Sequence, residues 1–450
     1  MFKIKLASLL FLVTVVNASN PLTLSEALDI LKSENLGIKS ATVKVDSAKL
    51  DIDSASGNHW GKLDFIQDYA NSDDAGNVFG FKLTSREATF GDFGFSEFDT
   101  TNPNILNVAP EVLNYPDSRN FFQSKLKYEV PLFTGFQISS YVEIMKSMAK
   151  MKALEKDKIV NEKIYQLRKS YYDMALLRNS AQNLNKILSN IKILEKMTTR
   201  MVEVGYAKKV DLLEVRAKKG NVHRLLLQMQ SNQKLLLHYI SFLLNSKVDN
   251  IIVPDFDIAM PLYSDKDILQ NNLDIQRATT GLEIRKDMID LSKSSYYPTV
   301  GAFAEVVTTD DTFLGDANEH KAYTVGARLT WNIFSGGIDN ANIEKSKLQH
   351  LETQIDLNYA KQGIILKVAK IRTEIETFDL EITSLKNELH LADEIYKNYA
   401  GRYREKLSSM SDVIIKQSEQ IQKILQLQES KNKRNERVFA LEKLANGEQI

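Results

Sequence analysis

Residues 364–403, IILKVAKIRTEIETFDLEITSLKNELHLADEIYKNYAGRY, decide the fold, because their apolar positions follow the period of a coiled-coil helix. The apolar side chains recur at strictly alternating steps of four and three residues, and no proline interrupts them. They are Ile364, Val368, Ile371, Ile375, Phe378, Ile382, Leu385, Leu389, Ala392, Tyr396, Tyr399 and Tyr403. We therefore predict one long helix over 338–404.

A second copy of this stretch lies 201 residues earlier, without an insertion. The matching pairs include Phe133–Gly135 with Phe334–Gly336, and Asp211 with Asp412. A first long helix is therefore predicted over 137–204. Each long helix would have roughly 67 residues and a length of about 100 Å.

The duplication continues upstream with a different offset. Asn35 to Asp53 matches Asn272 to Asp290 at an offset of 237, and 237 minus 201 leaves 36 extra residues in the first copy. These residues predict a long loop at 72–118, against a shorter one at 308–320 in the second copy.

The chain therefore divides into two similar halves joined by a linker at 248–263. The first half, 19–247, is predicted to contain a helix from Thr23 to about Ser56, a β-hairpin with loop 72–118, the long helix 137–204 and a return helix 209–245. The second half, 264–450, is predicted to contain a helix, a β-hairpin with loop 308–320, the long helix 338–404 and a return helix 410–446. Strands of roughly ten residues have the length that a tilted membrane strand needs.

Composition excludes several classes of function. Lys plus Arg equals Asp plus Glu at 58 each, so no overall field favours nucleic acid. The chain has no cysteine, and its six histidines show no metal-ligand spacing. No phosphate loop or nucleophile motif occurs. We therefore expect no enzyme activity, no cofactor and no metal site.

The first residues are typical of a secretory signal peptide over 1–18. Lys3 and Lys5 form a basic start, an apolar run extends from Leu6 to Val16, and Ala18 closes a small-residue cleavage site. A membrane anchor is the weaker alternative, because this run is too short to span a bilayer. We expect export, with any membrane crossing made by strands.

Four strands per chain cannot close a membrane barrel, since the smallest barrels need about eight and an open edge cannot lie in hydrocarbon. Oligomerisation is therefore expected. Three chains would supply twelve strands, with helical columns directly below them.

The chain resembles the TolC-type outer-membrane efflux proteins. The resemblance rests on the duplication, on the turn motifs Pro131–Gly135 and Ile333–Gly337, and on the spacing from Gly205 to Asp211 and from Lys406 to Asp412. It implies an all-α dominated fold with a membrane β-barrel, twelve-stranded in a homotrimer, in outer-membrane lipid. It also implies a helical coiled-coil tunnel through the periplasm that meets a periplasmic adaptor protein and an inner-membrane pump.

The resemblance assigns a periplasmic gate to Asp211, Asp412 and Tyr403. Both aspartates also fit ordinary helix caps, since a first-turn carboxylate is favoured at any helix N-terminus. Tyr403 also fits a core aromatic of the seam. Lys406 departs from the family pattern, because the turn usually has glycine there.

Two further sets of residues are candidates for the membrane region. The strand-to-helix turns contain Pro131, Phe133, Gly135, Phe334, Gly336 and Gly337. The candidates for an aromatic girdle are Trp60, Tyr297, Tyr323 and Trp331. Ordinary strand propensity explains these aromatics nearly as well.

The leading interpretation is a passive outer-membrane exit duct of a tripartite efflux or type I secretion system. The alternative is a secreted or surface coiled-coil adhesin or scaffold, which leaves the two matched hairpins without a purpose. The sequence does not separate drug, metal-ion and protein export.

Overall fold

The computed structural model describes residues 21–254, 258–315 and 318–447, so the predicted signal peptide lies outside the described residues. The described residues are mostly helical with four antiparallel strands, which confirms the predicted combination of long helices with four strands per chain. In chain order the elements are α1 (Leu24–Glu34), α2 (Leu36–Gly57), β1 (Lys62–Ser72), α3 (Ala75–Thr84), α4 (Glu111–Asn114), β2 (Arg119–Phe133), α5 (Gln137–Glu203), α6 (Lys209–Leu244), α7 (Asp265–Asn271), α8 (Leu273–Lys293), β3 (Thr299–Asp310), β4 (Lys321–Thr330), α9 (Ile338–Arg404) and α10 (Met410–Ala445). Short 3₁₀ turns connect several of them.

The described residues form two compact units. A sheet unit contains residues 47–149 and 281–353, and a helical unit contains the described residues up to 46, 150–280 and those from 354 onward. Each unit therefore combines segments of both sequence halves. The halves repeat in sequence, but neither half is a compact body by itself.

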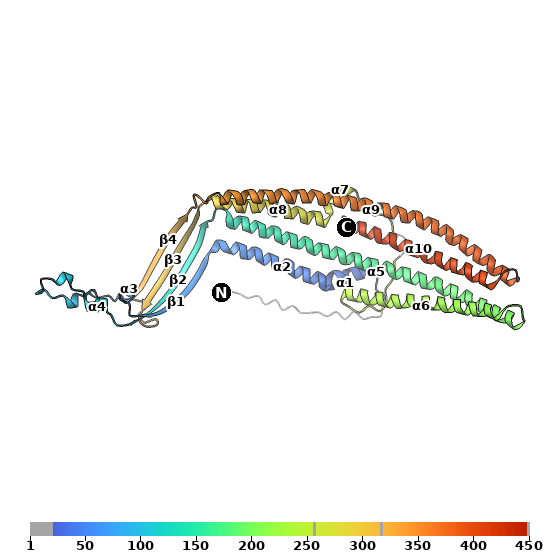
Figure 1. Cartoon of the computed structure of the whole chain (residues 1–450), viewed down its shortest axis with the longest axis horizontal. Coiled ribbons are helices and arrows are strands. Elements are labelled where there is room, and N and C mark those ends of the chain that lie inside the picture. Colours follow the sequence, from blue (N-terminus) through green and yellow to red (C-terminus); the bar gives the residue numbers. More distant parts are fainter. Residues whose placement is uncertain (1–20, 255–257, 316–317, 448–450) are drawn as a thin grey trace. The chain divides into compact units, whose positions relative to one another are not determined.

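The strands of the sheet unit lie in the order β1-β2-β3-β4, each antiparallel to its neighbour (Figure 1). The register pairs Leu63 with Tyr128 and Val306 with Tyr323. It shifts between Pro131 and Phe133, where a bulge accommodates a proline that has no N–H to donate. The order leaves β1 and β4 as the two edges of the sheet.

The connection between β1 and β2 is folded, although we expected a loop without helices there. Asp74 caps α3 by accepting a hydrogen bond from the Asn77 backbone N–H at 3.0 Å. The Phe81 ring stacks on Phe121 of β2, with ring centroids 4.2 Å apart. The prediction missed α3 because these caps and ring contacts replace the apolar periodicity by which a longer helix is recognised.

The predicted first helix is also two helices, because α1 ends at Glu34 and α2 begins at Leu36. The buried Asn35 between them has an extended backbone, and its Nδ2 donates to the Leu243 carbonyl at 2.7 Å. Asn272, which lies between α7 and α8, donates in the same way to the Leu444 carbonyl at 2.9 Å. The duplicated asparagines therefore join each short helix pair to the end of a return helix.

Two antiparallel helix hairpins build the core of the helical unit, α5 with α6 and α9 with α10 (Figure 1). On α9 the seam positions Val368, Ile371 and Ile375 are buried and pack in one cluster with Val438 and Leu441 of α10. The alternating period of the sequence is therefore the packing face of this helix.

Candidate transport surfaces: a two-faced sheet and the helix-hairpin tips

One face of the sheet is apolar. Residues directly opposite each other on antiparallel strands point to the same side, so the register assigns every strand residue to a face. The residues of this face include Leu63, Phe65, Tyr69, Leu126, Tyr128, Val306, Tyr323, Val325 and Leu329. All nine are exposed in the single chain, with Phe65 at 69% and Val325 at 72%.

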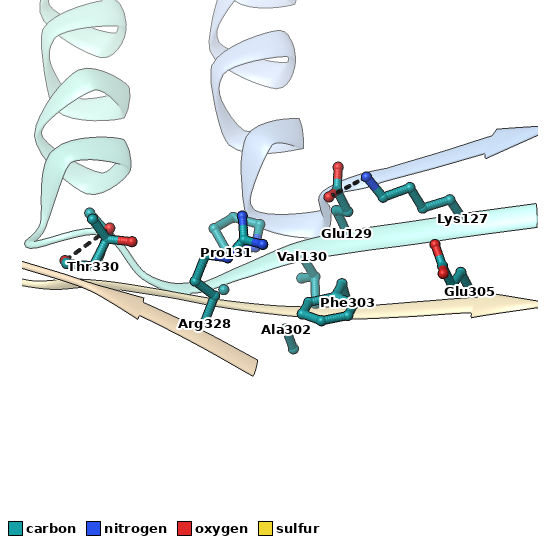
Figure 2. A pocket seen from close by; sticks show the side chains of 11 residues that line it. Lys127, Glu129, Val130, Pro131, Ala302, Phe303, Glu305, Arg328 and Thr330 are labelled. Atoms are coloured by element: carbon teal, nitrogen blue, oxygen red, sulfur yellow. Dashed lines mark hydrogen bonds and ion pairs between the residues drawn. The ribbon is translucent and has the colours of Figure 1, made fainter. Parts of the chain in front are cut away.

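The opposite face is charged. Its residues include Lys62, Asp64, Lys125, Lys127, Glu129, Glu305 and Arg328. A cavity of about 470 Å³ lies over this face and is lined by Lys127, Glu129, Glu305 and Arg328 (Figure 2). Lys127 and Glu129 form an ion pair at 2.7 Å.

Phe303 is one of the apolar side chains on the charged face. Its ring covers Gly326, the residue opposite it on β4, and a Cβ at position 326 would lie 2.6 Å from the ring. The glycine therefore lets an aromatic ring lie along the strands without projecting from the face.

Three of the four predicted girdle aromatics lie at one end of the sheet. Trp60 precedes β1, Tyr297 precedes β3 and Trp331 follows β4, whereas Tyr323 lies near the opposite end of β4. All four are exposed, Trp60 at 77% and Tyr323 at 80%. Only one member of the predicted set is therefore near the loop end.

The strand-to-helix turns use left-handed backbone at two successive residues. Gly135 has φ +60° and Phe136 has φ +67°, and the equivalent Gly336 and Gly337 have φ +64° and +87°. A Cβ at Gly135 would lie 2.7 Å from the Ser294 carbonyl oxygen. Phe136 was missing from the predicted turn residues, although the offset of 201 pairs it with Gly337.

The other turn positions lie beside these glycines. Phe133 packs edge-to-face on Phe136 with ring centroids 5.4 Å apart. Phe334 is 85% exposed in the single chain, and Pro131 lies at the bulge of β2. The phenylalanines of the two turns therefore have different surroundings.

The helix-hairpin tips are the turns from α5 to α6 and from α9 to α10, and they hold the two predicted gate aspartates. Asp412 accepts hydrogen bonds from the Ser409 hydroxyl at 2.7 Å and from the Ser409 backbone N–H at 3.1 Å. These bonds hold the pKa of Asp412 below its usual range. Asp211 accepts from the Lys208 backbone N–H at 2.9 Å. Both carboxylates therefore serve as helix caps in the single chain.

Tyr403 is buried, and its hydroxyl lies 3.3 Å from the Thr198 hydroxyl, which is also buried. This contact joins α9 to α5 near the tips. Burial raises the pKa of Tyr403, while the bond to Thr198 opposes that change in part. The residue is a core aromatic of this single chain that also carries a polar link between the two hairpins.

Lys406 has the left-handed conformation that its position requires, with φ +65° against φ +79° at the equivalent Gly205. Its ammonium lies 3.5 Å from the centroid of the Tyr206 ring on the other tip. Such a cation–π contact is worth about 0.5–1 kcal/mol at an exposed site. It offsets part of the backbone strain of a residue other than glycine at this turn.

Two more polar contacts across the tips could not be found from sequence spacing. The Ser411 hydroxyl donates to Glu214 at 2.6 Å, and Lys218 donates to the Ser418 hydroxyl at 2.5 Å. The partners in each pair lie on different hairpins. Together with the contacts of Tyr403 and Lys406, they fasten the two hairpins of one chain to each other.

Within the described ranges, no helix is both long and apolar enough to cross a membrane.

A sequence model of the family described as outer membrane efflux protein matches residues 266–447. No curated protein matches the sequence. Three solved channels of similar structure are CusC, VceC from Vibrio cholerae and CmeC from Campylobacter jejuni, at 13%, 13% and 14% identity. Each similarity covers 94% of this chain, and it covers 91%, 95% and 85% of the respective channel, with TM-scores of 0.76, 0.75 and 0.75. At such identities the structural similarity establishes the fold.

Proposed function

We propose that the chain is an outer-membrane efflux channel, since the model of that family matches residues 266–447, and that three copies assemble into one passive exit duct. In this assembly the sheets of three chains join edge to edge into one closed twelve-stranded sheet. The helices continue into the periplasm.

The two-faced open sheet is the observation that supports this proposal most strongly. Unpaired N–H and C=O groups on β1 and β4 would each cost several kcal/mol in hydrocarbon, so both edges need partner strands. Pairing β1 of one copy with β4 of the next satisfies both edges at once. The apolar face then contacts lipid, and the face with Lys127, Glu129 and Arg328 lines a watery passage.

The remaining partners follow from the family and from the helix hairpins. We propose that the tips meet a periplasmic adaptor protein and, through it, an inner-membrane pump that supplies the energy. Efflux of small molecules and type I secretion of proteins both fit a duct of this kind. The adhesin alternative fits less well, because a surface scaffold gains nothing from an apolar sheet face opposite a charged one.

Cysteine cross-linking tests the strand pairing directly, since the chain has no cysteine of its own. Each variant carries one cysteine on β1 and one on β4, at positions chosen along the two strands. Oxidation in isolated outer membranes should link β1 of one copy to β4 of the next and so produce covalent dimers and trimers. The matched control pairs Ser124→Cys on β2 with Val325→Cys on β4, two strands that are never neighbours in the proposed assembly. Cross-linking of the control pair alone would contradict the proposal.

Epitope tags test the orientation. Tags at Ala75 or Gly315, in the connections at the end of the sheet away from the strand-to-helix turns, should be accessible on intact cells. Tags that react only after permeabilisation would invert the proposed topology.

A further inference from the structure

Three side chains from distant segments of the sheet unit converge at its loop end. A carboxylate oxygen of Glu87, a carboxylate oxygen of Asp310 and a ring nitrogen of His320 all lie within 4.8 Å of one another. Glu87 follows α3, Asp310 ends β3 and His320 precedes β4. Sequence spacing could not reveal this cluster, because Glu87 lies in the connection between β1 and β2, whereas Asp310 and His320 flank the loop between β3 and β4.

The orientation of His320 is set by a backbone group. Its Nδ1 lies 3.1 Å from the Thr309 carbonyl oxygen, which can only accept, so Nδ1 carries the proton. In the neutral ring Nε2 is then the nitrogen with a free lone pair. Histidines that bind metals commonly donate their other N–H to a carbonyl in this way.

Asp310 is 6% exposed, and its carboxylate is held close to the backbone of the following connection. The Asp311 backbone N–H donates to Asp310 Oδ1 at 2.7 Å. A Cβ at Gly315 would lie 2.2 Å from Asp310 Oδ2, so this approach needs the glycine. The carboxylate is therefore positioned by the fold before any ligand arrives.

The local charge favours a cation. Glu87 forms an ion pair with Arg119, whose guanidinium also lies 3.7 Å from Asp311 Oδ2. Two carboxylates, those of Glu87 and Asp311, thus flank one guanidinium, and the carboxylate of Asp310 lies beside that of Glu87. Lys82, which lines a cavity with Arg119 and Asp311, pairs with Asp92 at 2.5 Å.

We propose that Glu87, Asp310 and His320 bind one divalent transition-metal ion per chain, for which Zn²⁺ is the probe. One imidazole nitrogen with two carboxylate oxygens suits zinc better than calcium or magnesium, which prefer oxygen ligands alone. Ligands at about 2.1 Å from a tetrahedral ion lie about 3.4 Å apart, a separation within reach of side-chain rotation from the observed cluster. The ion would tie the connection after α3 to the hairpin loop between β3 and β4.

Calorimetry on the purified full-length protein in detergent tests this site, using a tag without histidines and chelator-treated buffer at pH 7.5. Wild-type protein should bind one Zn²⁺ per chain, with little competition from Mg²⁺ or Ca²⁺. His320→Gln should weaken binding by on the order of 100-fold. His59→Gln, which changes an exposed histidine outside the cluster, is the matched control and should leave binding unchanged.

A second readout covers the case in which a variant assembles poorly. Zn²⁺ should raise the thermal unfolding temperature of wild-type protein and of His59→Gln, but not that of Asp310→Asn or Glu87→Gln. Zinc binding of equal strength in wild type and His320→Gln, or no zinc binding by folded wild-type protein, would overturn the site. Neither outcome depends on whether the protein conducts ions.

Discussion

Removal of the Tyr403 hydroxyl should loosen the link between the two helix hairpins. Tyr403→Phe keeps the aromatic ring in its buried position and deletes only the contact with Thr198, whose oxygen lies 3.3 Å from the Tyr403 oxygen. The change therefore acts on one interaction between α5 and α9. We expect it to favour an assembly whose tips are separated.

The magnitude follows from the burial of both partners. A buried neutral hydrogen bond contributes about 0.5–1.5 kcal/mol net, so each chain should lose about 1 kcal/mol. In an assembly of three chains that open together, the total is about 3 kcal/mol. Since about 1.4 kcal/mol is a factor of ten, the ratio of open to closed tips should rise roughly 100-fold.

Single-channel recording in planar bilayers measures this ratio as open probability. The double variant Thr198→Val, Tyr403→Phe serves as the control for stability, because it leaves no hydroxyl unpaired in the core. It should regain part of the unfolding free energy lost in Tyr403→Phe while keeping the raised open probability. If Tyr403→Phe conducts like wild type with an unchanged unfolding temperature, the hydroxyl is not a link between the hairpins.

Three further predictions concern other buried or charged groups. Asn35→Ala and Asn272→Ala should each lower the unfolding free energy by about 2 kcal/mol, because each leaves a buried helix-end carbonyl without its donor. Clearly unequal losses in thermal unfolding would contradict the equivalence of the two asparagines. Gln417→Leu should raise the unfolding free energy by about 1–3 kcal/mol, because the fully buried amide has no hydrogen-bond partner within the described structure. A lower unfolding temperature in this variant would refute the prediction. The double change Asp211→Asn, Asp412→Asn should abolish block of the conductance by multivalent cations from the periplasmic side, because it removes the carboxylate charges. It should preserve assembly, because an amide oxygen can still accept the capping bonds. A retained block would leave these aspartates as caps alone.

The long helices of this fold were predictable because their signals are periodic and repeated. The seam of α9 recurs over forty residues, and most of its apolar side chains contribute to three core clusters along the helix. The offset of 201 also relates the backbones of equivalent turns. Lys406 is left-handed like its repeat partner Gly205, and Phe136 is left-handed like Gly337. The sequence singled out Lys406 in this way but not Phe136.

The division of the first helix at Asn35 was not predictable from local propensity. The break depends on the Leu243 carbonyl, which lies more than two hundred residues away in the chain. Apolar residues continue through the break with nearly helical spacing, so the pattern alone indicates one helix. Tertiary context, in this case a buried donor, decided the local structure.

The two faces of the sheet were only partly visible in the sequence. Strand β4 alternates cleanly, but Ile66 in β1 and Val307 in β3 lie on the charged face with Lys127. The register is needed to combine four imperfect patterns into one apolar and one charged surface. The cluster of Glu87, Asp310 and His320 depends in the same way on chain topology.

The ion conductance of the wild-type protein, purified from outer membranes and reconstituted in a planar bilayer, tests the central claim most directly. A passive duct with a charged lining should give discrete current steps of uniform size, each from one three-chain assembly. The account would be contradicted if correctly folded and assembled protein inserts into the bilayer but gives no current steps, and if Tyr403→Phe gives none either. That result would favour a scaffold.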